Sequence, residues 1–205
     1  MVVTKITEIS KAKVKIMIDE EFAFVLYKGE LRSYHLCEGE EITENVYEEI
    51  LQTVLPKRAK LRAMHLLKAR PYTEKLLYGK LLEGGYPEAV CAEAVAYVKS
   101  FGYLNDRQYT LDYIDCYKMS KSSAQMKNTL LGKGISKELF EECLSEITEK
   151  EERDLEEEQI IALMKKKRFN PSEADFQEKQ KFCAFLYRKG FQIDKIRTVL
   201  SLDIT

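Results

Sequence analysis

Residues that commonly carry catalysis or bind metals are few in this sequence and stand far apart. The chain has two histidines, His35 and His65, and its five cysteines never form a C-x-x-C pair. A zinc site or an activated nucleophile needs several such side chains close together. The glycines of Gly132-Lys133-Gly134 match the end of a helix better than a phosphate-binding loop. The sequence therefore predicts no catalytic residue, no metal site and no bound cofactor.

Basic side chains, by contrast, come in blocks that could bind an anionic partner. Residues 57–70 hold six lysines and arginines without an acid, residues 116–137 hold five lysines without an acid, and residues 165–168 are all basic. A single lysine on a helix is usually only solvated, but the recurrence of these blocks favours contact with acidic protein surface or DNA phosphate. The predicted contact residues are Arg70, Lys118, Lys121, Lys127, Lys133, Arg168, Arg188 and Lys189.

The contact residues differ in how strongly their type indicates binding. We expect the three arginines, Arg70, Arg168 and Arg188, to contribute most, because a guanidinium pairs with carboxylate or phosphate in a planar fork. Lys133 and Lys189 each stand beside a glycine that ends a helix, where the helix dipole alone favours a cation. For these two lysines, partner binding and helix capping remain alternatives.

The acidic residues are segregated as well. Residues 138–158 hold eleven acids against two basic residues, although the chain has a formal net charge of −1. We interpret this run as a solvated face; the alternative is a surface that repels DNA, so that binding depends on a protein partner. No apolar run is long enough to span a membrane, and the N-terminus does not resemble a signal peptide. We expect a monomeric cytoplasmic protein without membrane contacts, with its cysteines packed as small apolar residues.

The elements that must position these side chains change character after the first 40 residues. Even-numbered residues from 14 to 18 and from 22 to 26 are apolar, which predicts half-buried strands. Polar turns, one of them at residues 28–30, divide residues 3–36 into an antiparallel meander with His35 in its last strand. Because so small a sheet is marginal alone, we expect it to pack on a helix beginning near Thr43.

From Thr43 onward the apolar spacing is helical, and no further strand is predicted. Prolines, capping residues and glycines divide this part into successive helices. One helix opens at Pro56 and stops before Pro71, and later ones end at Gly84-Gly85 and at Gly102. The residues predicted at helix starts are Pro56, Thr73, Pro87, Asn105, Ser123 and Ser136, before a last set of helices from about Leu155 through Gly190 to the C-terminus.

Three glycine-containing segments resemble one another at spacings of 49 and 56 residues, at 81–86, 130–135 and 186–191. In each, a bulky apolar residue follows a glycine (Gly85, Gly134 and Gly190), as in a Schellman stop, where glycine adopts the left-handed conformation. Such repetition predicts stacked three-helix units. We therefore expect a mainly α-helical fold: a small β meander plus a helix at 1–58, and three-helix repeats at 59–104, 105–150 and 151–205.

The junction of the first two repeats has the densest helix-capping signals. Its motif residues are Gly102, Tyr103, Leu104, Asn105, Asp106 and Tyr109. Gly102 stops one helix and Asn105 caps the next, with a return bond from Gln108 and a hydrophobic contact between Leu104 and Tyr109. We interpret the motif as structural. The tyrosines at positions 103, 109, 113 and 117 likewise favour core packing over stacking on nucleic-acid bases.

At this junction the sequence resembles the RecX family, the bacterial regulators of the RecA recombinase. The resemblance is carried by Gly102-Tyr103-Leu104-Asn105-Asp106 with Tyr109 and Tyr113, by Leu66-Leu67 with Arg70, and by the glycine stops at 131–135 and 186–191. It covers residues 59–202. Asn105 stands where the family commonly has aspartate, and asparagine also caps helices.

The resemblance implies a non-enzymatic regulator that binds the RecA filament and inhibits its ATP hydrolysis, strand exchange and coprotease activity. Such a protein would act in homologous recombination, DNA repair and the SOS response. The alternative is a helical-repeat protein that binds single- or double-stranded DNA directly and competes for it. The salt dependence of DNA binding would distinguish the two, because each phosphate contact steepens it.

Overall fold

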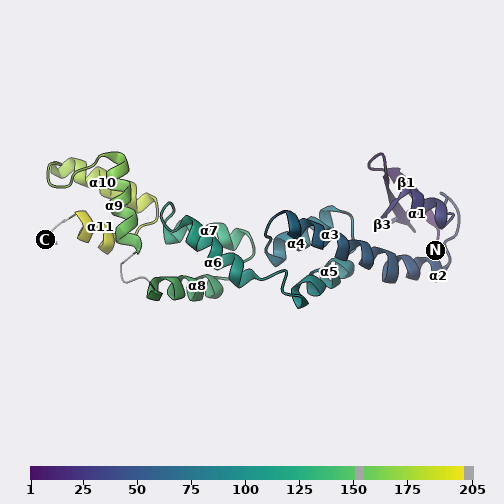
Figure 1. Ribbon diagram of the computed structural model, residues 1–205. Coiled ribbons are helices and arrows are strands. Elements are labelled where there is room, and N and C mark those ends of the chain that lie inside the picture. The colour runs from purple at the N-terminus through teal and green to yellow at the C-terminus, as the bar shows by residue number, and fades with distance from the viewer. Residues whose placement is uncertain (151–154, 201–205) are drawn as a thin grey trace. The chain divides into compact units, whose positions relative to one another are not determined.

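The structure, a computed structural model, describes residues 1–150 and 155–200 of the chain. Figure 1 shows its helices and strands. The chain divides into two compact units, unit 1 from Met1 to Asn105 and unit 2 from Asp106 to Thr205. Within the described residues, unit 1 contains a three-stranded sheet followed by helices, and unit 2 is helical.

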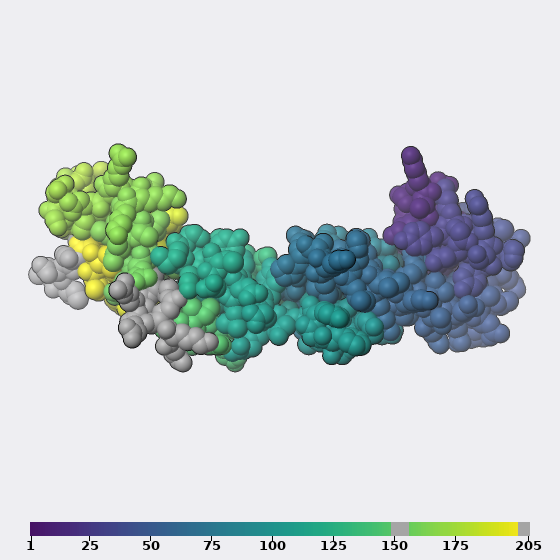
Figure 2. Space-filling view, in the orientation of Figure 1, coloured from purple at the N-terminus to yellow at the C-terminus, as the bar shows by residue number. Residues whose placement is uncertain are grey.

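The N-terminal residues form the predicted antiparallel meander, in the order β1-β2-β3. The strands are β1 (Val3–Glu8), β2 (Lys13–Ile18) and β3 (Glu21–Tyr27). Ile16 and Phe24 are fully buried, as the alternation predicts. Phe22 is 45% exposed instead, because the pairing of β2 with β3 shifts between Ile16 and Met17. This shift takes Phe22 out of the alternation of buried and exposed side chains. The turn between β1 and β2 projects from the body of unit 1 (Figure 2).

The predicted turn and strand over residues 28–36 are wrong, because this segment begins as a helix. Helix α1 spans Lys28–Ser33, and the Glu30 carboxylate accepts a 2.8 Å hydrogen bond from the backbone N–H of Tyr27. That bond pairs a backbone donor at the start of the helix. His35, predicted in a strand, follows α1 in the left-handed region with a φ of 51°.

The helix predicted near Thr43 is confirmed, but it continues through Pro56. Helix α2 (Glu44–Glu49) is capped by Thr43, and a π-helical turn, η1 (Ile50–Val54), joins it to α3 (Leu55–Ala69). Proline has no backbone N–H to donate to the hydrogen bonds of a helix, and its ring needs space in the preceding turn. The wider turn of η1, with Leu55 N–H bonded to Ile50, allows the helix to pass this point. The predicted helix from Pro56 to before Pro71 is confirmed as α3, with Pro56 in its first turn, but η1 joins it to α2 without the expected break.

Unit 1 is completed by α4 (Glu74–Glu83) and α5 (Glu88–Ser100), which pack with α3 as the first three-helix repeat. Thr73 caps α4, as predicted, and Pro87 stands directly before α5. One connected apolar cluster runs from the sheet through α2 and η1 into this repeat. Where the sheet contacts the repeat, a side chain added at Gly85 would place its Cβ 2.3 Å from the Cγ2 atom of Val25 in β3. Glycine is therefore required there for the sheet to pack on the repeat.

Unit 2 contains two further three-helix repeats. The second repeat is α6 (Asp106–Tyr117), α7 (Ser123–Gly132) and α8 (Lys137–Lys150); the third is α9 (Leu155–Lys167), α10 (Phe176–Arg188) and α11 (Ile193–Leu200). Ser136 caps α8 as predicted, but the cap of α7 is Ser122, and Ser123 is the first helical residue. The boundary predicted after residue 150 lies outside the described residues, as do residues 151–154 of the acidic run.

The predicted glycine stops are confirmed in all three repeats. Gly85, Gly134 and Gly190 have φ values of 81°, 94° and 89°. At the second stop, Ile135 N–H bonds to Leu130 at 3.0 Å and Gly134 N–H bonds to Leu131 at 3.0 Å, the pairing of a Schellman motif. The same two bonds recur around Gly85 and Gly190. Each following apolar residue is buried, so each stop also anchors the next segment in a core.

Candidate partner-binding surface

Helix α6 places three tyrosines on one face, and two lysines from neighbouring segments lie against them. Tyr109, Tyr113 and Tyr117 follow one another at intervals of four residues, which aligns them along the helix. Lys121, in the segment after α6, donates a 2.6 Å hydrogen bond to the Tyr113 hydroxyl, and Lys133, at the end of α7, donates a 2.7 Å bond to the Tyr109 hydroxyl. These five residues form the tyrosine–lysine cluster.

The rings of the cluster hold the ammonium groups in defined positions. Lys121 Nζ lies 4.0 Å from the centre of the Tyr117 ring and 5.0 Å from that of Tyr113, and Lys133 Nζ lies 5.3 Å from the centre of the Tyr109 ring. Such cation–π contacts orient the cations without neutralising them. The two ammonium groups therefore lie beside aromatic surface.

Core packing, which the sequence favoured for the tyrosines, describes only part of this arrangement. Tyr109 and Tyr113 are half-buried and pack against the core of the second repeat. Tyr117 is 39% exposed and Tyr103, in unit 1, is 61% exposed, so the core-packing prediction is wrong for these two. Leu104 is buried in the core of unit 1 and Asn105 directly precedes α6, at the position of the predicted cap.

The other two predicted lysines of the second repeat are paired with acids instead. Lys118 lies 2.9 Å from Asp115, and Lys127 lies 2.7 Å from Glu141 of α8. The hydrogen bond from Lys127 lowers the pKa of the Glu141 carboxyl below its usual value. The charges of Lys118 and Lys127 are therefore compensated within the protein by these acids.

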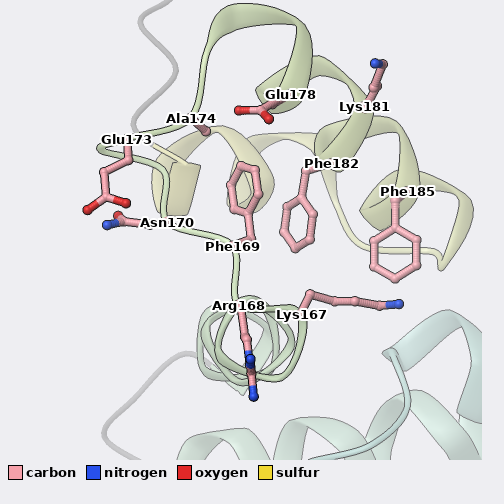
Figure 3. A pocket seen from close by; sticks show the side chains of 10 residues that line it. All are labelled: Lys167, Arg168, Phe169, Asn170, Glu173, Ala174, Glu178, Lys181, Phe182 and Phe185. Atoms are coloured by element: carbon pink, nitrogen blue, oxygen red, sulfur yellow. The ribbon is translucent and has the colours of Figure 1, made fainter.

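In the third repeat, basic residues border an open pocket that is lined by three phenylalanines (Figure 3). The pocket has a volume of about 620 Å³. Phe169 and Phe182 stack with their ring centres 4.1 Å apart, and Phe182 lies 5.6 Å from Phe185. Lys167 and Lys189 place their ammonium groups 5.6 and 5.4 Å from the Phe185 ring centre. Lys167 and the phenylalanine row were not among the predicted contact residues.

The predicted arginines are exposed, and they do not share one environment. Arg168 ends α9 in the left-handed conformation with a φ of 53°, and Figure 3 shows its side chain pointing away from the phenylalanine row. Arg188 donates to the carbonyl of Ala184 one turn earlier in α10. Arg70 belongs to unit 1, follows α3, and lies 4.6 Å over the ring of Tyr72.

Lys189 has a further role within unit 2. Its carbonyl accepts a 2.6 Å hydrogen bond from the Ser122 hydroxyl, which joins the end of α10 to the start of α7. The Gln159 side chain of α9 also donates to the Lys118 carbonyl. These two bonds therefore connect the second and third repeats.

No helix within residues 1–150 and 155–200 combines the length and the hydropathy needed to cross a membrane.

Comparison with known proteins identifies relatives along nearly the whole chain. Residues 59–98 match the model of the first three-helix domain of RecX, and residues 155–200 match that of the third. Regulatory protein RecX of Caldanaerobacter subterraneus subsp. tengcongensis is 32% identical over 98% of this chain and 100% of that protein. Regulatory protein RecX of Clostridium perfringens, strain SM101, is 30% identical over 96% of this chain and 94% of that protein.

Solved structures have the same fold. A crystal structure of regulatory protein RecX matches with a TM-score of 0.63 at 21% identity, covering 98% of both chains. RecX from Lactobacillus salivarius also gives a TM-score of 0.63, at 24% identity over 72% of this chain and 96% of that one. With three-helix domains matched in both units and 32% identity over nearly its full length, the chain belongs to the RecX family of regulatory proteins.

Proposed function

We propose that this protein binds the RecA recombinase filament and inhibits its ATP hydrolysis, strand exchange and coprotease activity, without catalysing a reaction of its own. The observation that carries the proposal is the relationship to proteins named regulatory protein RecX, which extends over 98% of the chain. A regulator of this kind acts through surface contacts, so its binding residues must be exposed and chemically complementary to a partner.

The tyrosine–lysine cluster is the strongest contact surface of the second repeat. Tyrosine is enriched in protein interfaces because its rigid ring buries apolar area while its hydroxyl still bonds to polar groups. Lys121 and Lys133 are already oriented by hydroxyls and rings, which reduces the entropy lost when they bind a carboxylate. Lys118 and Lys127 would first have to leave Asp115 and Glu141, so they contribute less.

The test is ATP hydrolysis by the host RecA on single-stranded DNA, titrated with this protein. We expect the unmodified protein to inhibit at less than one copy per RecA subunit. A variant combining Lys121→Gln with Lys133→Gln should need about ten times more protein, because two charge-assisted contacts are lost. The matched control, Lys118→Gln with Lys127→Gln, removes the same charge and should inhibit nearly as well. No inhibition by unmodified protein at equimolar concentration would contradict the proposal.

Direct DNA binding is the second candidate, and the exposed ring of Tyr117 in the cluster favours it. Tyrosines interleaved with lysines are typical of surfaces on which single-stranded nucleic acid stacks. Binding of a labelled single strand, measured without recombinase at several salt concentrations, would give a log–log slope of about −0.7 for each phosphate contacted. Tight binding with a steep slope, weakened by Tyr117→Ala, would favour this candidate. Weak binding together with RecA inhibition would exclude competition for DNA.

A further inference from the structure

Unit 1 contains a second group of cations, at a pocket between the sheet and the first repeat. The pocket has a volume of about 590 Å³. Its lining includes four basic residues from three different elements and two tyrosines, which together are called the basic pocket here: Lys13, Arg58, Arg62, Lys80, Tyr27 and Tyr86. Lys13 begins β2, Arg58 and Arg62 lie one turn apart on α3, and Lys80 lies on α4.

Arg58 is the central residue of this pocket. One terminal nitrogen, Nη1, donates to Glu30 at 2.8 Å and to the Val25 carbonyl at 3.4 Å. The guanidinium lies 4.4 Å from the centre of the Tyr27 ring and 5.7 Å from that of Tyr86. Its Nε is buried and has no hydrogen-bond partner within the described residues. A buried donor without an acceptor is costly, so the protein's own acceptors satisfy the Arg58 guanidinium only in part.

The surrounding charges make the pocket positive. Arg62 is exposed and has no acidic partner among the described residues, and Lys13 Nζ lies 5.3 Å from the Tyr27 ring centre. Glu83, the acid that lines the pocket, is paired with Lys80 at 2.5 Å. Burial raises the pKa of the Tyr86 hydroxyl, while Arg58 and Arg62 act in the opposite direction. Tyr86 thus remains a neutral hydrogen-bond donor beside two guanidinium groups.

We propose that the basic pocket binds a phosphate group, carried either by a free nucleotide or diphosphate or by the backbone of a nucleic acid. Phosphate suits the pocket because it offers several acceptor oxygens around one centre, and the donors approach from α3, α4 and the sheet. The volume accommodates a group of this size, and the tyrosine rings provide a surface for an attached sugar or base. The pocket uses residues before position 59, outside the segment matched to the first RecX domain.

The test uses the full chain and two probes. Inorganic pyrophosphate is titrated by calorimetry, and a fluorescein-labelled twelve-residue thymidine oligonucleotide is titrated by anisotropy at fixed salt. The test variant combines Lys13→Gln with Arg62→Gln and leaves Arg58, which holds the sheet on α3, in place. The control variant combines Lys5→Gln with Lys57→Gln, which also removes one cation from the sheet and one from α3 but outside the pocket. Circular dichroism and thermal midpoints verify that both variants fold.

We expect the test variant to bind at least about tenfold more weakly than the unmodified protein, and the control to bind within about twofold. A selective loss of pyrophosphate binding identifies a free phosphate ligand. A selective loss of oligonucleotide binding alone identifies the nucleic-acid backbone. If neither probe binds, or if both variants lose affinity equally, the pocket is not a phosphate site. RecA inhibition by the test variant is measured separately, so failure of this proposal is distinguishable from failure of the regulatory function.

Discussion

The two units are built from the same three-helix repeat but are held together differently. In unit 1, buried apolar residues form one connected cluster from Phe24 in the sheet to Val98 in α5. In unit 2, the described buried apolar residues form two clusters, one in each repeat. The contacts that join these repeats include the bond from Ser122 to the Lys189 carbonyl and the bond from Gln159 to the Lys118 carbonyl. A shared three-helix repeat therefore does not determine how strongly it depends on the element beside it, which is the sheet in unit 1 and another repeat in unit 2.

The glycine stops illustrate this difference. Gly85 lies against the apolar side chain of Val25, whereas Gly190 lies against Ala124 and the Ser122 hydroxyl. Hydrophobic contact over a continuous core couples the stability of neighbouring elements, whereas a few polar bonds contribute little each. We therefore expect unit 1 to unfold as a whole and the third repeat to open independently of the second.

The largest expected effect is that of Gly85→Ala. The new Cβ would clash with Val25 and force a side chain into the left-handed region, which should lower the free energy of unfolding of unit 1 by about 3 kcal/mol. Urea unfolding followed by circular dichroism measures this loss. Gly102→Ala is the matched control, because Gly102 has a φ of 72° but open space around it, and it should cost only about 1 kcal/mol. Equal losses in both variants would show that the sheet contact is unimportant.

Gly190→Ala should act on a smaller part of the molecule. Its Cβ would lie 2.8 Å from the Ala124 Cβ, and we expect a loss of about 2 kcal/mol confined to the third repeat. Hydrogen exchange read by mass spectrometry should show faster exchange in α9 to α11 and unchanged exchange in α6 to α8. Equally faster hydrogen exchange in the second and third repeats would mean that unit 2 unfolds as one body. That result would contradict the difference that we expect between the two units.

The buried thiol of Cys91 should make the stability of unit 1 depend on pH. Burial raises its pKa from 9.0 to about 11, so the unfolded chain releases this proton first as the pH rises. Stability is therefore complete below pH 9, falls by about 1.4 kcal/mol by pH 10, and is lost further up to pH 11. Urea unfolding at pH 8 and pH 10 measures the difference. In Cys91→Ala this part of the pH dependence should disappear; if it persists, other groups cause it.

The smallest expected effect is a gain in stability at Arg168. This arginine occupies the left-handed position of a helix stop, with Phe169 N–H bonded to Met164 at 2.9 Å, where the repeats otherwise use glycine. Arg168→Gly removes that strain and should stabilise the third repeat by about 1 kcal/mol. The readout is hydrogen exchange in α9, with Arg168→Ala, which keeps the strain but loses the charge, as the control. Equal stability of the two variants would show that the backbone strain is negligible.

Much of the fold was readable in the sequence because its signals are local. A Schellman stop is made by bonds between residues three and five positions apart, so glycine followed by an apolar residue identified the ends at Gly85, Gly134 and Gly190. Thr43, Thr73 and Ser136 cap helices through a bond to the residue three positions later. The cap of α7 was misplaced by one residue because Ser122 and the adjacent Ser123 could both cap a helix. The helix at Lys28 was predicted as a turn and a strand because the residues of this segment fit either structure.

The chemical character of the surface depended on the tertiary structure. Lys121 and Lys127 belong to the same block of lysines without an acid. In the structure Lys121 lies on tyrosines, whereas Lys127 pairs with Glu141 on the next helix. Glu30 and Arg58 are 28 positions apart, and nothing local indicated that packing would bring them together at the pocket. Whether a charge is compensated depends on groups within a few ångströms, and the packing of helices and strands decides which groups those are.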